Sequence, residues 1–402
     1  MNILVYRWHS YHQHDIETNL IALGHNLTFL NAPFNNIEKD LPYTEMVIKK
    51  LATQNFDLLF SSNYFPVLAE ACHAADTLYV CWNCDSPLIA MYHKSIFYDT
   101  NRIFTFDYSN MQEFKALGVS NIYHLPLASD TNRIYNTISA SSNPMDIRHR
   151  NYKYDISFIG SLYEKNSYDK IADRLPDYLC GYLDGALYAQ LQISGGNILE
   201  KLLTPDICRQ LEEISDYHKS KDSFADISTL FSTTVLGFKS ASIQRRLYLN
   251  KLSMHFNIKC CDNIQKREVH LFTTSNTDEL PFVIPHDSVD YYTQMPVIFS
   301  MSHINLNMTI PNIKTGIPLR VWDILSSGGF LMTDFRPELT EYFTPDKDIV
   351  IFEDVDELVQ KADFYLNHDT LMRKIAANAY EKVSKIHTCR ERLKQIFKTI
   401  KL

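Results

Sequence analysis

Short apolar runs alternate with helical patterns along the first third of the chain. The runs lie at 2–6, 26–30, 57–60, 77–82, 102–106 and 121–125. Between them, apolar residues recur with the 3.6-residue period of an amphipathic helix. Strands that alternate with helices predict βαβ units and a parallel sheet. We therefore expect a Rossmann-like domain at residues 1–130.

The alternation resumes after residues 131–151, a polar stretch without periodicity that is expected to be a linker. Strands of a second Rossmann-like domain at 152–386 are predicted from the runs at 154–160, 253–258, 268–273, 304–308, 330–333 and 348–352. Residues from about 164 to 252 favour helices and are too many for a normal crossover, so we expect a helical insert there. A C-terminal helix is expected at 387–402. The predicted fold class is α/β, with two Rossmann-like domains facing across a cleft.

Residues 302–334 carry the clearest candidate binding site. A strand is followed by a polar loop, a helix with Pro318 in its first turn, and a second strand. In a parallel sheet, such a loop and helix N-terminus lie at the carboxyl edge of the strands, where ligands bind. Lys314 and Arg320 add positive charge to the helix dipole, which suits a diphosphate, and Asp323 fits hydrogen bonds from a sugar diol. The alternative from these residues alone is an ordinary surface helix with a glycine stop.

A second loop is expected at the same edge. It follows the run at 154–160 and carries Gly160, Ser161 and Lys165. Gly160 allows a ligand to approach the backbone closely. Taken alone the loop reads as a tight turn, but beside Lys314 and Arg320 it becomes a second phosphate-facing loop.

Composition narrows the class of partner. The chain has 402 residues with 39 Lys and Arg against 47 Asp and Glu, and a net charge of −8 argues against nucleic acid as the main partner. No run reaches the roughly 18 apolar residues that span a bilayer, and the N-terminus turns polar too soon for a signal peptide. We expect no transmembrane segment and a cytoplasmic location. The eight cysteines follow no disulfide spacing, so reduced thiols are expected.

Two cysteine readings compete with plain structural thiols. Cys81 and Cys84 form a Cys-x-x-Cys motif, which is compatible with a redox pair. A zinc site with Cys260 and Cys261 is the other reading, although adjacent cysteines rarely bind one tetrahedral metal together.

Asp85 comes just beyond the carboxyl end of a predicted strand. That position suits a general base or a group that orients a hydroxyl, with helix capping as the alternative. The histidines His9, His12 and His14 are expected at the polar surface, with only His9 placed toward the cleft, and we expect no metal site.

In their order along the chain, these motifs resemble a glycosyltransferase of the GT-B fold. The stretch from INLNMTIPNIKTGIPLRVWDILSSGGFLMTDF to DIVIFEDVDELVQKADFYL resembles the glycosyltransferase group 1 domain of bacterial CgeB-like proteins of the spore-maturation type. The segments YVCWNCDSPL, RIFTFDYS and HLPLASD resemble the uncharacterised N-terminal domain that often precedes it. GYLDGALYAQLQISGGNILEKLLT resembles the helical insert of the same proteins, so the resemblance spans nearly the whole chain.

The resemblance implies a metal-independent, hexosyltransferase-like enzyme without a cofactor. Its donor would be a nucleoside diphosphate sugar, with uridine the expected base, and its acceptor a hydroxyl of a protein or glycan. Catalytic roles are implied for Asp85, Arg320 and Lys314. Donor binding is implied for Gly160, Ser161, Lys165, Thr315, Gly316, Asp323, Gly328 and Gly329.

One departure from the pattern leaves alternatives open. The family 4 enzymes carry Glu-x7-Glu, whereas here Thr315 stands eight residues before Asp323. Retaining stereochemistry is therefore open, and Asp85 stays available as the base of an inverting reaction. A nucleotide-sugar epimerase of GT-B architecture and a non-catalytic nucleotide-binding or scaffold protein are the alternative functions. A homo-oligomer is left open.

Overall fold

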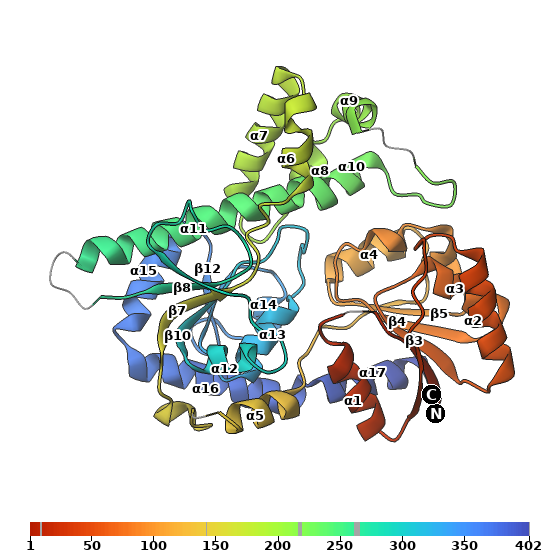
Figure 1. Ribbon diagram of the computed structural model, residues 1–402, viewed down its shortest axis with the longest axis horizontal. Coiled ribbons are helices and arrows are strands. Elements are labelled where there is room, and N and C mark those ends of the chain that lie inside the picture. Colours follow the sequence, from red (N-terminus) through yellow and green to blue (C-terminus); the bar gives the residue numbers. More distant parts are fainter. Residues whose placement is uncertain (9, 142, 216–218, 261–265, 402) are drawn as a thin grey trace. The chain divides into compact units, whose positions relative to one another are not determined.

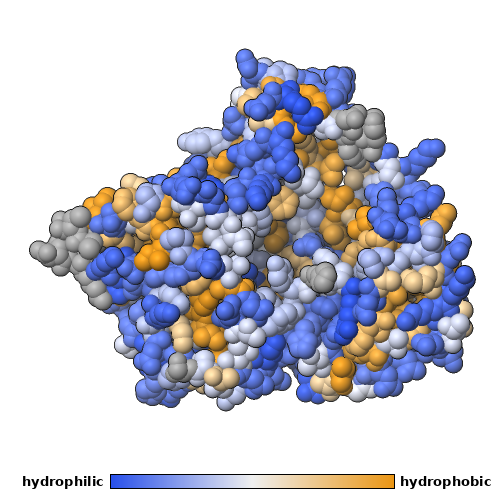
Figure 2. Space-filling view, viewed as in Figure 1, coloured by the Kyte–Doolittle hydropathy of each residue, from blue (hydrophilic) through white to orange (hydrophobic). Residues whose placement is uncertain are grey.

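The computed structural model describes residues 1–8, 10–141, 143–215, 219–260 and 266–401 (Figure 1). This chain divides into two compact units. Unit 1 consists of Met1–Asp130 with the described parts of Tyr217–Leu230 and Thr388–Leu402; unit 2 consists of the described parts of Thr131–Asp216 and Phe231–His387. On the face drawn in Figure 2, hydrophilic residues cover most of the surface, and the apolar residues form separate patches.

Unit 1 contains a parallel six-stranded sheet with the order β2-β1-β3-β4-β5-β6. Its strands are β1 (Asn2–Tyr6), β2 (Asn26–Leu30), β3 (Leu58–Ser62), β4 (Leu78–Trp82), β5 (Asn101–Thr105) and β6 (Ile122–His124). Its helices include α1 (Gln13–Ala22), α2 (Leu41–Thr53), α3 (Pro66–Ala74) and α4 (Tyr108–Ala116). Because both faces of a parallel sheet are covered, its inner strands are buried on both sides, and residues 3–5 have no exposed surface. α17 (Cys389–Ile400) packs against α1.

Unit 2 contains a second parallel six-stranded sheet, with the order β12-β11-β10-β7-β8-β9. Its strands are β7 (Tyr154–Ile159), β8 (Val269–Phe272), β9 (Val283–His286), β10 (Ser302–Asn307), β11 (Leu331–Asp334) and β12 (Val350–Phe352). Its helices outside the insert are α5 (Thr131–Ser139), α12 (Met295–Ser300), α13 (Leu319–Ser326), α14 (Leu339–Tyr342), α15 (Val355–Leu366) and α16 (Asp369–Ile386). α5, α12 and α13 pack against one another, and α13 also packs against α16.

The predicted helical insert lies between β7 and β8. It comprises α6 (Ser167–Ile171), α7 (Asp177–Leu191), α8 (Leu199–Leu202), α9 (Pro205–Ser215), α10 (Ile227–Phe231) and the long α11 (Gly237–Cys260). A π-helical turn at Ser232–Leu236 joins the last two. α6 and α7 pack against α11, which also packs against α15 (Figure 1). The contact between α11 and α15 is therefore one attachment of the insert to the rest of unit 2.

Several sequence expectations are wrong in detail. Residues 253–258 belong to α11 and not to a strand, because Leu249, Leu252 and Phe256 are buried at helical spacing. The expected linker begins with α5, whose buried Ile134 and Ile138 lie one helical turn apart. α1 begins at Gln13, and Asp15 lies in its first turn. None of the described helices is both long enough and apolar enough to cross a membrane.

Candidate active site

The first strand of unit 2 lies at the centre of its sheet. β7 pairs with β8 on one side, and β10 later pairs with β7 on the other. Such a topological switch point opens a crevice at the carboxyl ends of the two central strands, where ligands of open parallel sheets bind. The loop after β7, at 160–166, and the loop after β10, at 308–318, both start here. These are the two loops that the sequence singled out.

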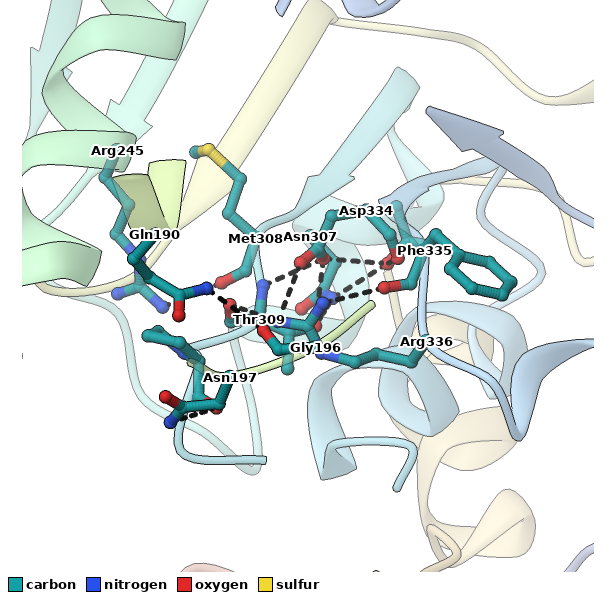
Figure 3. Close-up of polar contacts among 12 residues, drawn as sticks. Gln190, Gly196, Asn197, Arg245, Asn307, Met308, Thr309, Asp334, Phe335 and Arg336 are labelled. Carbon is teal, nitrogen blue, oxygen red and sulfur yellow. Dashed lines mark hydrogen bonds and ion pairs between the residues drawn. The ribbon is translucent and has the colours of Figure 1, made fainter. Parts of the chain in front are cut away.

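Arg245 of α11 links the starts of both loops. Its Nη1 donates to the carbonyl oxygen of Ser161 at 2.6 Å, and its Nη2 donates to that of Met308 at 2.9 Å; Figure 3 labels Arg245 and Met308. The guanidinium carbon also lies 5.2 Å from the ring centre of Phe158 and 4.7 Å from that of Tyr163. Burial lowers the pKa of Arg245, and its Nε has no hydrogen-bond partner among the residues that the structure describes. A buried cation therefore lies at the switch point.

Sequence reasoning missed Arg245, although its helix contained a signal. Arg245, Leu249 and Leu252 follow one another at helical spacing, so the arginine shares the face that enters the core. A cation on an otherwise apolar face indicates a specific buried partner, because burying an unpaired charge is costly.

A buried ion pair between Asp334 and Arg336 lies beside β10 (Figure 3). The carboxylate and guanidinium groups are 3.2 Å apart, and the side chains are 7% and 6% exposed. Oδ1 of Asp334 accepts hydrogen bonds from the N–H and the hydroxyl of Thr309, both at 2.9 Å. Arg336 donates to the carbonyl oxygen of Thr309 at 2.9 Å. The pair thus holds the residue at which the loop after β10 departs.

The helical insert reaches the same edge of the sheet. Gln190 of α7 fixes the loop that follows its helix: Nε2 donates to the carbonyl of Gly196 at 3.0 Å, and Oε1 accepts from the N–H of Ile198 at 2.9 Å. Nδ2 of Asn197 donates to the carbonyl of Pro311 at 3.0 Å (Figure 3). A cavity of about 20 Å³, enough for one water molecule, is lined by polar side chains that include Gln190, Thr309, Asp334 and Arg336.

Lys314, Thr315 and Gly316 lie in the loop after β10, and two of them have acidic partners. Nζ of Lys314 is 3.2 Å from Oε2 of Glu200 on α8. The hydroxyl of Thr315 donates to the carboxylate of Glu338 at 2.8 Å, and Glu338 is 1% exposed. The sequence count found no carboxylate at Thr315, but the structure brings one from 23 residues further along the chain. Gly316 is buried in the same loop.

Arg320 and Asp323 lie on α13, as predicted. Arg320 is half-buried: one guanidinium nitrogen contacts the sulfur of Met295, and the guanidinium carbon lies 5.7 Å from the ring centre of Phe299. Asp323 is 4% exposed and accepts a hydrogen bond from the hydroxyl of Tyr291 at 2.9 Å. A ligand that uses Asp323 therefore competes with, or adds to, a buried hydrogen bond.

The structure corrects the role expected for Gly328 and Gly329. They follow α13 and precede β11, so they lie at the amino end of a strand, whereas the two candidate loops leave from carboxyl ends. A methyl group on Gly329 would come within 2.6 Å of the side-chain nitrogen of Asn305. One on Gly328, whose φ is 64°, would come within 3.0 Å of the guanidinium of Arg150. These glycines permit close packing at the end of the helix and do not face the crevice.

Gly160, Ser161 and Lys165 lie just beyond β7, where the sequence placed them. A methyl group on Gly160 would lie 3.3 Å from the ring of Phe158. Ser161 and Lys165 are exposed. Both residues are therefore accessible to an anion at the carboxyl edge.

In unit 1, Asp85 follows β4 at the carboxyl edge of the sheet. Its Oδ2 accepts a hydrogen bond from Nδ2 of Asn63 at 2.6 Å. Asp85 is exposed at the surface. The protein packed around its carboxyl group removes part of the water and raises the pKa of that group, whereas the hydrogen bond from Asn63 lowers it. A carboxylate that is held by an amide and accessible from solvent suits a general base.

The thiols of the Cys-x-x-Cys motif are not those of a redox pair. Cys81 and Cys84 are free thiols. Burial raises the pKa of both, whereas a reactive thiol needs a lowered pKa. The other two cysteines of the zinc site considered from the sequence are not described: the side chain of Cys260 and the whole of Cys261 lie outside the described residues. Among the residues described, no group of three or more His, Cys, Asp and Glu could hold a metal ion.

The surface position expected for His12 is wrong. His12 is 1% exposed, its Nδ1 shares a hydrogen bond with the hydroxyl of Ser10 at 3.0 Å, and burial lowers its pKa to about 4. His14 is exposed, and His9 lies outside the described residues.

Comparisons with known proteins agree with this architecture. A family model described as "Glycosyl transferase-like" matches residues 261–398. A glycosyltransferase from Rickettsia africae has a similar structure, with a TM-score of 0.52 and 10% identity over 100% of this chain and 97% of that one. HepE of Anabaena, in complex with UDP and glucose, has a TM-score of 0.56 and 10% identity over 100% and 99% of the two chains. A sucrose-phosphate synthase from Thermosynechococcus elongatus has a TM-score of 0.53 and 9% identity over 100% and 99%.

No protein of curated function matches the chain significantly in sequence. The two parallel six-stranded sheets and the structural similarities establish the fold class as α/β, of the GT-B type. Within this fold, most of the glycosyl transferase-like segment at 261–398 belongs to unit 2, and its last residues belong to α17 of unit 1.

Proposed function

We propose that this chain is a glycosyltransferase that moves a hexose from a nucleoside diphosphate sugar, with uridine as the base, to a hydroxyl of a protein or glycan. One observation carries the proposal: the glycosyl transferase-like segment at 261–398 contains the 308–318 loop and the N-terminus of α13, beside the switch point of unit 2. HepE, which shares the fold, has a structure in complex with UDP and glucose.

In this proposal the diphosphate lies against the exposed Ser161 loop and the loop after β10. The acceptor oxygen attacks the anomeric carbon, the bond from that carbon to the diphosphate oxygen breaks, and the nucleoside diphosphate leaves with the bonding electrons. Lys314, Arg320 and the dipole of α13 stabilise its negative charge without a metal ion. Asp323 holds the ribose, and in an inverting reaction Asp85 takes the acceptor proton.

Nucleotide binding is the first test. In a thermal-shift titration with UDP, GDP, ADP, CMP and dTDP, we expect UDP to stabilise the chain. A ligand at 100 times its dissociation constant adds about 2.7 kcal/mol to the unfolding free energy, which is large enough to measure. Stabilisation by another nucleotide would change the donor, and stabilisation by none would favour the scaffold alternative.

Turnover is the second test. Replacing Arg320 with Ala should lower the rate by a factor of about a hundred, as expected for one lost contact to developing charge. Asp85→Asn should abolish an inverting reaction. Conversion of the donor without an acceptor would indicate the epimerase, and binding without consumption of the sugar would indicate the scaffold protein. We also propose that the chain is a bacterial CgeB-like protein and that it is cytoplasmic. Localisation in the producing cell tests the second of these proposals.

A further inference from the structure

Asn63 connects two strand ends of unit 1. It follows β3, has a φ of 66°, and is 2% exposed. Its Oδ1 accepts hydrogen bonds from the backbone N–H groups of Cys84 at 2.8 Å and Asp85 at 3.4 Å. Its Nδ2 donates to Oδ2 of Asp85 at 2.6 Å. Both ends of one amide are therefore used on the loop that carries Asp85.

The backbone contacts settle which way this amide points. A backbone N–H can only donate, so the side-chain atom facing Cys84 must be the oxygen. The NH₂ group must then face the carboxylate of Asp85. The bond between Asn63 and Asp85 is thus a donor to an acceptor that carries charge when ionised, which is a stronger class of hydrogen bond than a neutral pair.

Asn63 is itself held from two strands. The hydroxyl of Ser61 on β3 donates to the carbonyl of Asn63 at 2.6 Å. That hydroxyl also lies 2.8 Å from the hydroxyl of Tyr79 on β4, which accepts from the N–H of Phe65 at 3.0 Å. Tyr79 has no exposed surface. The backbone of Asn63 is therefore anchored to the core of the sheet, and its side-chain amide extends from there to the loop that carries Asp85.

The other titratable groups around Asp85 are few among the described residues. The Cys84 thiol also contacts Oδ1 of Asn63, at 3.3 Å, and burial raises its pKa, so it is uncharged near neutral pH. His12, on the segment after β1, is neutral above a pKa of about 4. Asp107, before α4, accepts a hydrogen bond from Ser86 at 3.1 Å. None of these groups donates to the Asp85 carboxylate in a hydrogen bond that the structure records, whereas Asn63 does.

We propose that Asn63 is the positioning residue of Asp85, aiming its carboxylate at the acceptor hydroxyl and favouring its ionised form. This inference rests on the proposed function, in which Asp85 takes the acceptor proton. Burial and the amide act in opposite directions on Asp85: burial favours the protonated acid, while a donor to the carboxylate favours the base. Loss of the donor should therefore leave Asp85 protonated to a higher pH, and the rate should fall earlier on acidification.

Asn63→Asp removes the donor and also places a second carboxylate beside that of Asp85, and both changes favour the protonated form of Asp85. Aspartate tolerates a positive φ and keeps an oxygen for the N–H groups of Cys84 and Asp85, but it replaces the NH₂ group with a carboxylate. We expect the acid limb of the pH–rate profile to move upward by at least about one to two pH units, the size of a hydrogen bond to a charged group, because repulsion between the two carboxylates adds to the lost bond. The titration of the Asp85 carboxyl carbon, followed by NMR and assigned with Asp85→Asn, should move by the same amount. Asn63→Gly, which keeps the backbone conformation without any side chain, should shift both in the same direction.

Asn101→Ala is the matched control. Asn101 is another fully buried asparagine of the same sheet, but its side-chain amide donates to the carbonyls of Ser95 and Ile96. This variant should lose stability while its acid limb and the Asp85 titration stay in place. An equal shift in Asn101→Ala, or no shift in either Asn63 variant, would overturn the inference. Absence of transfer with every donor would overturn the proposed function instead, and the NMR titration would still measure whether Asn63 sets the ionisation of Asp85.

Discussion

The carboxylate of Asp323 accepts a hydrogen bond from the hydroxyl of Tyr291 at 2.9 Å, and the two residues are only 4% and 8% exposed. Asp323, the residue proposed to bind the ribose, therefore lies on α13 in contact with a tyrosine that precedes α12. A carboxylate can accept several hydrogen bonds, so a structural bond and a bond from a sugar diol are compatible. Asp323 can therefore have a structural role, a role in binding the ribose, or both.

Two substitutions separate these roles. Tyr291→Phe removes one buried hydrogen bond and should lower the unfolding free energy by about 1 kcal/mol while the stabilisation by UDP is retained. Asp323→Ala should lower the unfolding free energy as well and should also remove most of the stabilisation by UDP. Thermal-shift curves with and without UDP measure both effects. A full response to UDP in Asp323→Ala would make this carboxylate purely structural.

The ion pair between Lys314 and Glu200 predicts competition with the donor. Its N–O distance is 3.2 Å, and both side chains are about one-third exposed. If Lys314 binds the diphosphate, Glu200→Gln should free it and strengthen UDP binding up to about fivefold, since such a pair is worth at most about 1 kcal/mol. Lys314→Met should weaken binding. Calorimetric titration with UDP measures both.

The pair between Lys251 and Asp356 provides the control for this competition. It is also exposed, with an N–O distance of 2.6 Å, and it joins α11 to α15 within unit 2. Asp356→Asn should leave the affinity for UDP unchanged. An equal gain in Asp356→Asn and Glu200→Gln would reduce the effect to overall charge, and Lys314 would lose its assigned role.

Local patterns predicted most of the fold. The run at 2–6 is β1 because the four residues after Asn2 are apolar or aromatic and buried, as both covered faces of a parallel sheet require. The unit from 302 to 334 became β10, α13 and β11 because its periodicity changes from two to 3.6 residues and back. The strand expected at 253–258 is wrong because polar and apolar residues alternate there over only six positions. The helical spacing of Leu249, Leu252 and Phe256 becomes visible only when the preceding residues are included.

The candidate site was less predictable because its contacts span long distances in the sequence. Ser161 and Lys314 were found by a local rule, since residues after parallel strands meet at one edge. The bonds from Arg245 to Ser161 and from Asn63 to Asp85 join residues 84 and 22 positions apart. No local pattern encodes such a pair. Sequence alone therefore located the edge of the sheet but not the residues that organise it.

His12 predicts how the stability of unit 1 depends on pH. Burial lowers its pKa to about 4 in the folded chain, while the unfolded chain should show the ordinary value of about 6.5. Between these values the unfolded state binds more protons, so stability is full above about pH 6.5 and is lost as the pH falls toward 4. The loss between pH values of about 7.5 and 5 should be about 2 kcal/mol from this residue.

Urea unfolding followed by tryptophan fluorescence can measure this loss. The ring of His12 lies 5.7 Å from that of Trp82, which reports on unit 1. His12→Gln should flatten the dependence on pH by the amount that His12 contributes. The same slope in the variant would assign the loss to other groups. His14→Gln is the control, because His14 is exposed.

Two glycines of the helical insert should respond in opposite ways to substitution by alanine: Gly195 in the loop after α7, and Gly181 within α7. Gly195 has a φ of 68° and lies against the ring of Phe335, so a methyl group there meets both backbone strain and a clash. Gly195→Ala should lower the unfolding free energy of unit 2 by more than about 1 kcal/mol. Gly181 lies on the exposed face of α7, where a methyl group meets nothing within 4 Å, so Gly181→Ala should raise the unfolding free energy by up to about 1 kcal/mol.

Because the Gly195 loop also carries Asn197, which binds the carbonyl of Pro311, Gly195→Ala should weaken UDP binding while Gly181→Ala leaves it unchanged. Equal UDP affinity in both variants would separate the insert from the donor site and leave it a purely structural role at this edge of the sheet.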